Sequence, residues 1–105
     1  VTGGGLAGNM VRIMPEGLTA DMSRATWTPG PIFKTIAELG NVSREEMEKT
    51  FNMGVGMVAI VSAEDRDRAL ALLTARHINA WELGTVRKSE AGEDRAVLRG
   101  SHPRF

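Results

Sequence analysis

The chain has 105 residues, of which 42% are hydrophobic and 25% charged, which is enough for one soluble domain with a buried core. Thirteen Lys and Arg residues balance thirteen Asp and Glu residues, and this zero net charge argues against a surface for nucleic acid or an anionic membrane. The lack of cysteine excludes disulfides, a thiol nucleophile and a Cys-based metal site. Zero net charge does not exclude a local binding pocket for an anion.

A run of three glycines opens the first predicted helix. Thr2-Gly3-Gly4-Gly5 stands directly before apolar residues at helical spacing, which predict a helix over residues 6–13 that Pro15 stops. Glycines at a helix start expose backbone N–H groups at the positive end of the helix dipole, so the run can cradle an oxyanion or phosphate, with Thr2 adding a hydroxyl donor. The alternative is a tight turn without a ligand. The spacing matches neither a Walker-type loop nor the dinucleotide fingerprint.

A strand normally leads into such a glycine loop, and the chain has no residues for it. We therefore expect the chain to be a piece of a longer protein.

The next elements follow from turn and capping signals. Residues 18–22 predict a short edge strand, and Pro31 suits the first position of a helix with an apolar face and a C-terminal cap at Gly40. Ser43 and Glu46 form a capping box for a third helix, which we expect to end at residues 52–54.

A second glycine loop, with Asn52, Gly54 and Gly56, precedes an apolar run. One interpretation is a helix cap followed by a strand bulge. The other is a flat loop whose backbone contacts a ligand, with Asn52 offering a donor and an acceptor from one side chain.

The second half of the chain predicts a strand, a helix and a strand. The run 57–61 predicts a strand covered on both faces, Ser62 caps a helix, and residues 78–86 form another strand bulged at Gly84, which together imply a right-handed parallel crossover. Residues 96–98 form a last strand, paired antiparallel through a polar loop. The expected buried residues include Phe51, Ile60, Leu70 and Leu73.

These elements predict an α+β fold with a small mixed sheet and helices packed on its faces. We expect residues 1–99 to form the domain and residues 100–105 a flexible tail.

Few single residues indicate chemistry. Asn9 is mildly disfavoured inside a helix, so a polar contact is expected there, and Arg12 is either a surface arginine or a bidentate phosphate ligand. His77 and His102 have no carboxylate at metal-ligand spacing, so we predict no catalytic residue and no metal ligand in this chain.

Several motifs in order resemble one family, the aminoimidazole ribonucleotide synthetases, also called phosphoribosylformylglycinamidine cyclo-ligases. The resemblance covers residues 1 to about 86 and is to the C-terminal domain of a two-domain fold. The motifs are Thr2-Gly3-Gly4-Gly5-Leu6, Asn9, Arg12, Met14-Pro15-Glu16-Gly17, Trp27, Pro31-Ile32-Phe33, Gly40-Asn41-Val42, Glu46-Met47 and Thr50-Phe51-Asn52-Met53-Gly54-Val55-Gly56-Met57.

The resemblance implies a cytoplasmic, usually dimeric enzyme of purine biosynthesis. It would close formylglycinamidine ribonucleotide to aminoimidazole ribonucleotide, with ATP and magnesium bound mainly by an N-terminal domain that this chain lacks. Nucleic acid and membranes are not expected partners. Matched positions imply substrate or phosphate contact for Thr2, Gly3, Gly4, Gly5, Asn9 and Arg12, and a cleft-lining loop at Asn52, Gly54 and Gly56.

Two rival hypotheses remain. One is a non-catalytic module that binds a nucleotide or a protein. The other is a related enzyme of the same fold, selenophosphate synthetase or thiamine-monophosphate kinase, which lacks the Phe-Asn-Met-Gly-x-Gly-Met form of the second loop.

Overall fold

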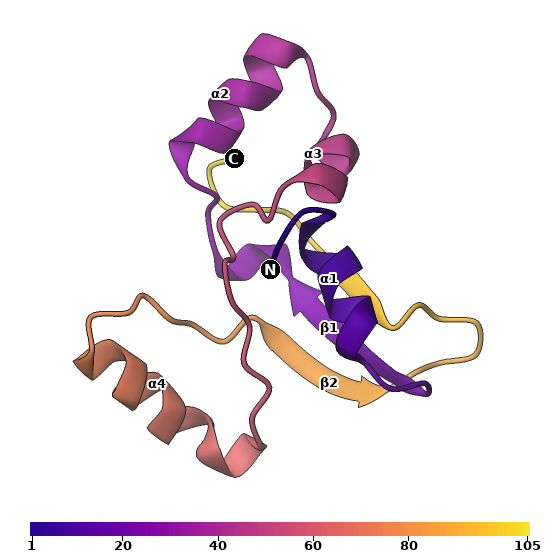
Figure 1. Ribbon diagram of the computed structural model, residues 1–105, viewed down its shortest axis with the longest axis vertical. Coiled ribbons are helices and arrows are strands. Elements are labelled where there is room, and N and C mark those ends of the chain that lie inside the picture. Colours follow the sequence, from indigo (N-terminus) through magenta and orange to yellow (C-terminus); the bar gives the residue numbers. More distant parts are fainter.

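A computed structural model describes residues 1–105 and has four α-helices, two short 3₁₀ helices and three strands (Figure 1). In chain order they are α1 (Gly5–Ile13), β1 (Leu18–Ser23), η1 (Arg24–Thr26), α2 (Pro31–Gly40), α3 (Arg44–Thr50), η2 (Ala63–Asp65), α4 (Arg66–Ala75), β2 (Gly84–Lys88) and β3 (Ala96–Arg99). The predicted α+β class and mixed sheet are confirmed. No helix is long and apolar enough to span a bilayer.

The sheet has the order β2-β1-β3. Strand β1 pairs antiparallel with β2, from Leu18 opposite Lys88 to Met22 opposite Gly84, and parallel with β3. Two predictions were therefore wrong: residues 18–22 form the central strand rather than an edge, and the last strand pairs with β1 rather than antiparallel to its predecessor. The loop after β2 carries the chain across β1. There the hydroxyl of buried Thr19 donates to the Asp94 carbonyl at 2.9 Å and accepts from the Ser89 hydroxyl at 2.6 Å.

The core lies between this sheet, α1 and α3. Ten buried hydrophobic residues form one cluster, and methionines supply five of them, because aromatic residues make up only 5% of the chain. Met47 of α3 is fully buried, at 0% exposure. The cluster is Leu6, Met10, Met14, Ala20, Met22, Trp27, Met47, Met53, Val55 and Ala96.

The helix ends mostly follow the predicted signals. Pro31 begins α2, and the Ser43 hydroxyl accepts a hydrogen bond from the Glu46 N–H at the start of α3. The C-terminal cap of α2 is Asn41, in a left-handed conformation with φ 51°, rather than Gly40, which is the last helical residue. Asparagine tolerates this conformation better than most residues that carry a Cβ.

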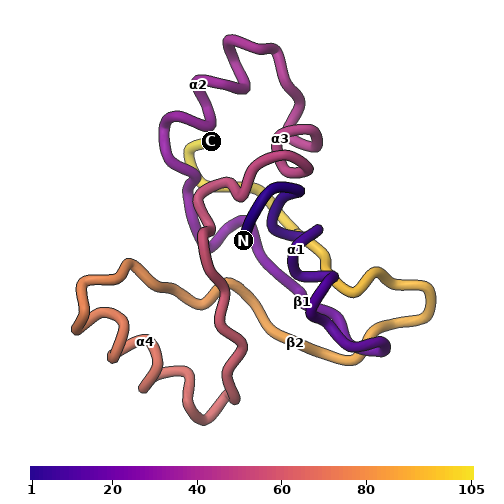
Figure 2. Tube along the Cα trace, in the orientation of Figure 1, coloured from indigo at the N-terminus to yellow at the C-terminus, as the bar shows by residue number.

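Residues 57–83 form an arm whose central part, around α4, extends away from the rest of the molecule, which we call the body (Figure 2). Its two ends contact the body, because Val58, Trp81 and Leu83 pack against the core. The run 57–61 has no strand partner, and Met57 and Ile60 are 88% and 52% exposed, so the predicted doubly covered strand and the parallel crossover were wrong. Phe51, and Leu70 and Leu73 of α4, are half-buried rather than buried. The pattern is apolar, but no neighbouring strand satisfies the backbone of this run.

The last six residues, expected to be a tail, lie back along the body. Arg24 donates a hydrogen bond to the Gly100 carbonyl, Thr28 donates one to the Pro103 carbonyl, and His102 is buried. The yellow end of the chain in Figure 1 accordingly runs past α3 toward α2.

Candidate functional site

The glycine run forms the turn into α1. Gly4 is the N-cap residue with φ 100°, and Gly5 has φ 82°, so both occupy the left-handed region that glycine adopts without strain. No side chain caps the helix. The first backbone N–H groups of α1 have no partner within the helix, but Gly5 and Leu6 are buried, so the part of this turn that a ligand can reach is the exposed Thr2, Gly3 and Gly4.

The three glycines serve different purposes. A Cβ added at Gly3 would meet nothing within 4 Å, and one added at Gly4 would meet only the Arg12 guanidinium, at 3.2 Å. At Gly5 a Cβ would collide with the Glu48 carbonyl of α3. Gly3 and Gly4 thus leave the loop open to a ligand, whereas Gly5 allows α1 to pack against α3.

Asn9 holds this loop in shape. Its side-chain amide donates to the carbonyls of Thr2 (3.0 Å), Gly5 (2.7 Å) and Gly3 (3.4 Å). Its Oδ1 accepts from the backbone N–H and the hydroxyl of Thr2, both at 3.2 Å. The polar contact that was expected for Asn9 inside a helix is therefore its set of hydrogen bonds to the glycine loop.

Arg12 is the cation of the loop. It is exposed, it sits in the last turn of α1, and its guanidinium lies beside Gly4. It belongs to none of the ion pairs in the structure. An unpaired guanidinium next to open glycines can bind an anion through two parallel hydrogen bonds.

The second glycine loop is a tight turn fixed from inside. Asn52 Oδ1 accepts from the Gly54 N–H at 2.8 Å, and Met53 and Gly54 have φ 54° and 98°. The indole of Trp27 donates to the Met53 carbonyl at 2.9 Å in the core. A Cβ at Gly56 would meet nothing within 4 Å, so this part of the loop is open as well.

The two loops lie together. The backbone nitrogen of Val1 lies 2.7 Å from the Gly56 carbonyl, although 55 positions separate these residues. Beside the second loop is a hollow of about 300 Å³. It is lined by Thr26, Trp27, Thr28, Gly30, Gly54, Asn79 and Trp81.

One supporting element was not predicted. Glu48, whose carbonyl abuts Gly5, accepts two hydrogen bonds from Arg24, at 2.8 and 2.9 Å, and both side chains are only 12% exposed. Arg24 also donates to the carbonyls of Leu98 and Gly100, so it ties α3 to the end of β3. Nothing in the spacing of residues 24 and 48 signals this pair.

A second ionic cluster lies on the sheet. Arg87 donates to both carboxylate oxygens of Glu93 at 2.7 Å and to Asp21 at 3.0 Å. The Arg87 hydrogen bonds, with that of the Glu90 N–H, lower the pKa of Glu93 to about 2. No group of three or more acidic or histidine side chains is placed to hold a metal ion.

Comparison with known families places the chain in one of them. Residues 1–96 match the family described as AIR synthase related protein, C-terminal domain. The chain belongs to this family.

Named relatives agree. The chain is 51% identical over 94 residues to the "Putative phosphoribosylformylglycinamidine cyclo-ligase" of Streptomyces fradiae, covering 89% of this chain and 52% of that protein. It is 46% identical over 98 residues to the phosphoribosylformylglycinamidine cyclo-ligase of Methylobacillus flagellatus, covering 93% of this chain and 28% of that protein. The corresponding protein of Burkholderia ambifaria is 47% identical over 98 residues. The chain thus spans between a quarter and about half of the length of these relatives.

Proposed function

We propose that this domain supplies the phosphate-binding side of the active site of a phosphoribosylformylglycinamidine cyclo-ligase, the ATP-dependent enzyme that closes formylglycinamidine ribonucleotide to aminoimidazole ribonucleotide. The observation that carries the proposal is the first glycine loop. No side chain caps α1, the turn before it is exposed at Gly3 and Gly4, and the Arg12 guanidinium lies beside Gly4. The names of the relatives supply the reaction.

Each residue of the two loops has a defined part in this proposal. Gly3 and Gly4 bind a phosphate group through the backbone and Arg12 neutralises its charge. Thr2, whose N–H and hydroxyl both donate to Asn9, keeps the loop in its binding shape together with Asn9 and Gly5. Asn52, Gly54 and Gly56 are proposed to line the cleft next to this loop, which Gly56 meets at the backbone nitrogen of Val1. Fixed N–H donors at a helix start stabilise an oxyanion without reorganisation, which is how such a loop contributes to binding and positioning.

In this proposal, ATP and magnesium are bound mainly by an N-terminal domain, which corresponds to the part of the relatives that this chain does not cover. ATP activates the formyl oxygen of the substrate by phosphorylation. The residues of this chain bind and orient the substrate rather than make bonds. The whole enzyme is proposed to be a cytoplasmic homodimer, with no nucleic acid or membrane as partner.

The 105-residue chain alone is accordingly expected to have no cyclo-ligase activity, because the ATP-binding half is needed for the reaction. The purified chain should release no product from formylglycinamidine ribonucleotide with ATP and magnesium. ATP-dependent product formation by this chain would contradict the proposal that another domain binds ATP. If the gene encodes an upstream domain with acidic metal-binding motifs, this would support the enzyme hypothesis over that of a non-catalytic binding module.

The phosphate site can be tested on the chain itself. Titration with inorganic phosphate should shift the amide resonances of residues 3–7, and Arg12→Gln should weaken binding roughly tenfold, because a charged hydrogen-bond donor is lost. The matched control is Arg76→Gln, an exposed arginine at the end of α4 in the arm. Equal binding by the wild type and Arg12→Gln would show that the loop is only a turn.

A further inference from the structure

The last six residues, Gly100–Phe105, are held against the body by specific contacts, and we call them the C-terminal clip. Arg24 donates to the Gly100 carbonyl at 3.1 Å, and Thr28 donates to the Pro103 carbonyl at 2.8 Å. Between these two points, His102 turns inward, and only 1% of its side chain is exposed.

The imidazole of His102 occupies a closed environment. Its Nδ1 lies 3.0 Å from the Arg24 carbonyl and 3.2 Å from the Trp27 carbonyl. Because both neighbours only accept, Nδ1 carries the proton of the neutral ring. The other nitrogen, Nε2, is buried without a hydrogen-bond partner, 3.9 Å from a Glu48 carboxylate oxygen.

The same ring touches the residue that supports the second glycine loop. His102 packs edge-on against Trp27 with the ring centres 4.5 Å apart, and the Trp27 indole donates to the Met53 carbonyl at 2.9 Å. Met53 has a left-handed backbone, φ 54°, inside the loop that includes Gly54 and Gly56. A chain of direct contacts therefore runs from the clip through one indole to the candidate site.

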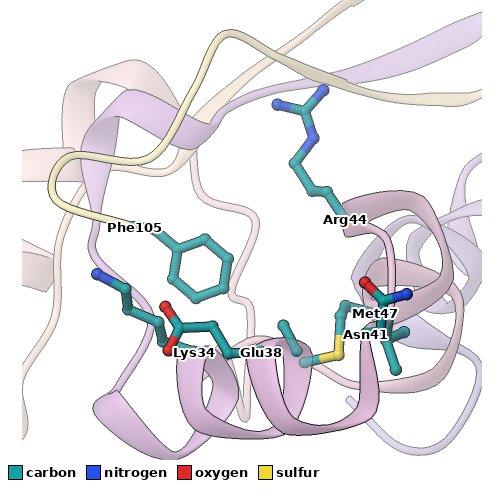
Figure 3. A pocket seen from close by; sticks show the side chains of 8 residues that line it. Lys34, Glu38, Asn41, Arg44, Met47 and Phe105 are labelled. Carbon is teal, nitrogen blue, oxygen red and sulfur yellow. The ribbon is translucent and has the colours of Figure 1, made fainter.

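Phe105 anchors the other end of the clip. Its ring lies over a pocket of about 380 Å³ between α2 and α3, and Figure 3 shows it facing the side chains of both helices. The floor of this pocket includes Met47, and charged groups surround it, Lys34 and Glu38 on α2 and Arg44 on α3. His102 and Phe105 also contact each other edge-on, with centres 5.7 Å apart, so the two aromatic rings form one anchor.

We propose that His102 is a positioning residue for the second glycine loop: the clip docks with a neutral imidazole, fixes the Trp27 indole, and thereby holds Met53 and Gly54 in place. Protonation of His102 releases the clip and loosens the loop. The role of that loop in catalysis rests on the proposed function, but its coupling to the clip does not.

The charged groups around the ring set the direction of this switch. Glu48 of α3 and Arg24 of η1 face it. Burial lowers the pKa of His102, and this outweighs the opposing effects of the Trp27 and Arg24 carbonyls at Nδ1 and of the Glu48 carboxylate, while the Arg24 charge lowers the pKa further. A folded pKa below the unfolded value means that docking is fully present above about pH 6.5 and is lost as the pH falls toward the folded pKa.

The test is a pH titration of the chain by NMR between pH 8 and pH 5. The His102 ring should titrate with a midpoint below about 6.5. The Trp27 indole N–H and the Gly54 amide should shift with the same midpoint, whereas the Gly4 amide should not. If neither resonance follows His102, the proposal is wrong.

A variant pair gives the second measurement. His102→Asn should abolish those coupled shifts and speed solvent exchange of the Trp27 indole proton about tenfold at pH 8, as expected when one packed hydrogen-bonded contact is lost. His77→Asn, at the exposed end of α4, is the matched control and should change neither. Unchanged indole exchange in His102→Asn would overturn the proposal, and if that variant fails to fold, the wild-type titration decides alone.

Discussion

The body and the arm are built from similar amino acids but differ in what covers them. The run 57–61 is at least as apolar as β1, yet β1 lies between two strands while 57–61 pairs with none. The radius of gyration is 14.4 Å, whereas a compact chain of this length would have about 13 Å. An apolar sequence favours burial of its side chains, but it forms a strand only where a neighbouring strand is present to bond its backbone.

The largest effect should come from the close contact between α1 and α3 in the body. Gly5→Ala places a Cβ on the Glu48 carbonyl and forces a left-handed alanine, so we expect the variant to lose most of its stability, which for a folded domain is typically about 5–15 kcal/mol. Gly8→Ala is the control, because it has open space and lies within the same helix, where it should add about 0.5–1 kcal/mol. Urea melts would measure both, and a stable Gly5→Ala would disprove the close packing.

The next contrast compares one residue of each region. Met47→Ala removes a fully buried side chain and should cost about 2–5 kcal/mol. Leu72→Ala, on the exposed face of α4, should change stability by less than about 0.5 kcal/mol. Half-buried Leu70, which the sequence placed in the core, should fall between them. A Leu72 effect as large as that of Met47 would mean that the arm is packed in solution.

Two ion pairs of the body should show a similar contrast between buried and exposed side chains, on a smaller scale. Arg24→Met leaves the Glu48 carboxylate poorly solvated and should cost roughly 1–3 kcal/mol. Lys49→Met breaks a pair whose side chains are 71% and 62% exposed, and its effect should be near zero. Thermal melts at low and high salt would test this, and an Arg24→Met protein as stable as the wild type would contradict it.

The smallest effect concerns the ionic cluster on the sheet. The pKa of Glu93 is lowered to about 2, below its unfolded value, so its contribution is present above about pH 4.5 and is lost as the pH falls toward 2. Melts of the wild type should show this decline, and Glu93→Gln should have a flatter profile over the same range. Identical profiles would show that the cluster does not stabilise the body.

Local signals in the sequence predicted the local structure well. Glycines at 3–5 followed by an apolar period led to α1, and Pro31 and Ser43 led to the starts of α2 and α3. Helix capping and turn formation depend on residues that are close in the sequence, so these elements can be predicted from it. The family motifs also identified the family correctly.

Long-range pairing was less predictable. The order β2-β1-β3 depends on a loop that crosses β1 and on buried Thr19, and neither leaves a periodic pattern. For the site, the sequence pointed to Asn9 and Arg12, but the contacts of Asn9 with the loop carbonyls required the structure. Arg24, Glu48 and His102 were missed because their contacts join residues far apart in the chain.

Segment 57–61, which has no strand partner, makes the isolated chain prone to aggregate at high concentration. It contains five apolar residues in an extended backbone, without a charge or a proline, and three of them are among the exposed large hydrophobics. Such a segment is a template for intermolecular cross-β growth, because identical copies can satisfy each other's amide groups. A lysine introduced at Ala59 would act as a gatekeeper against fibril formation, and thioflavin fluorescence of the two proteins at matched concentration would show the difference.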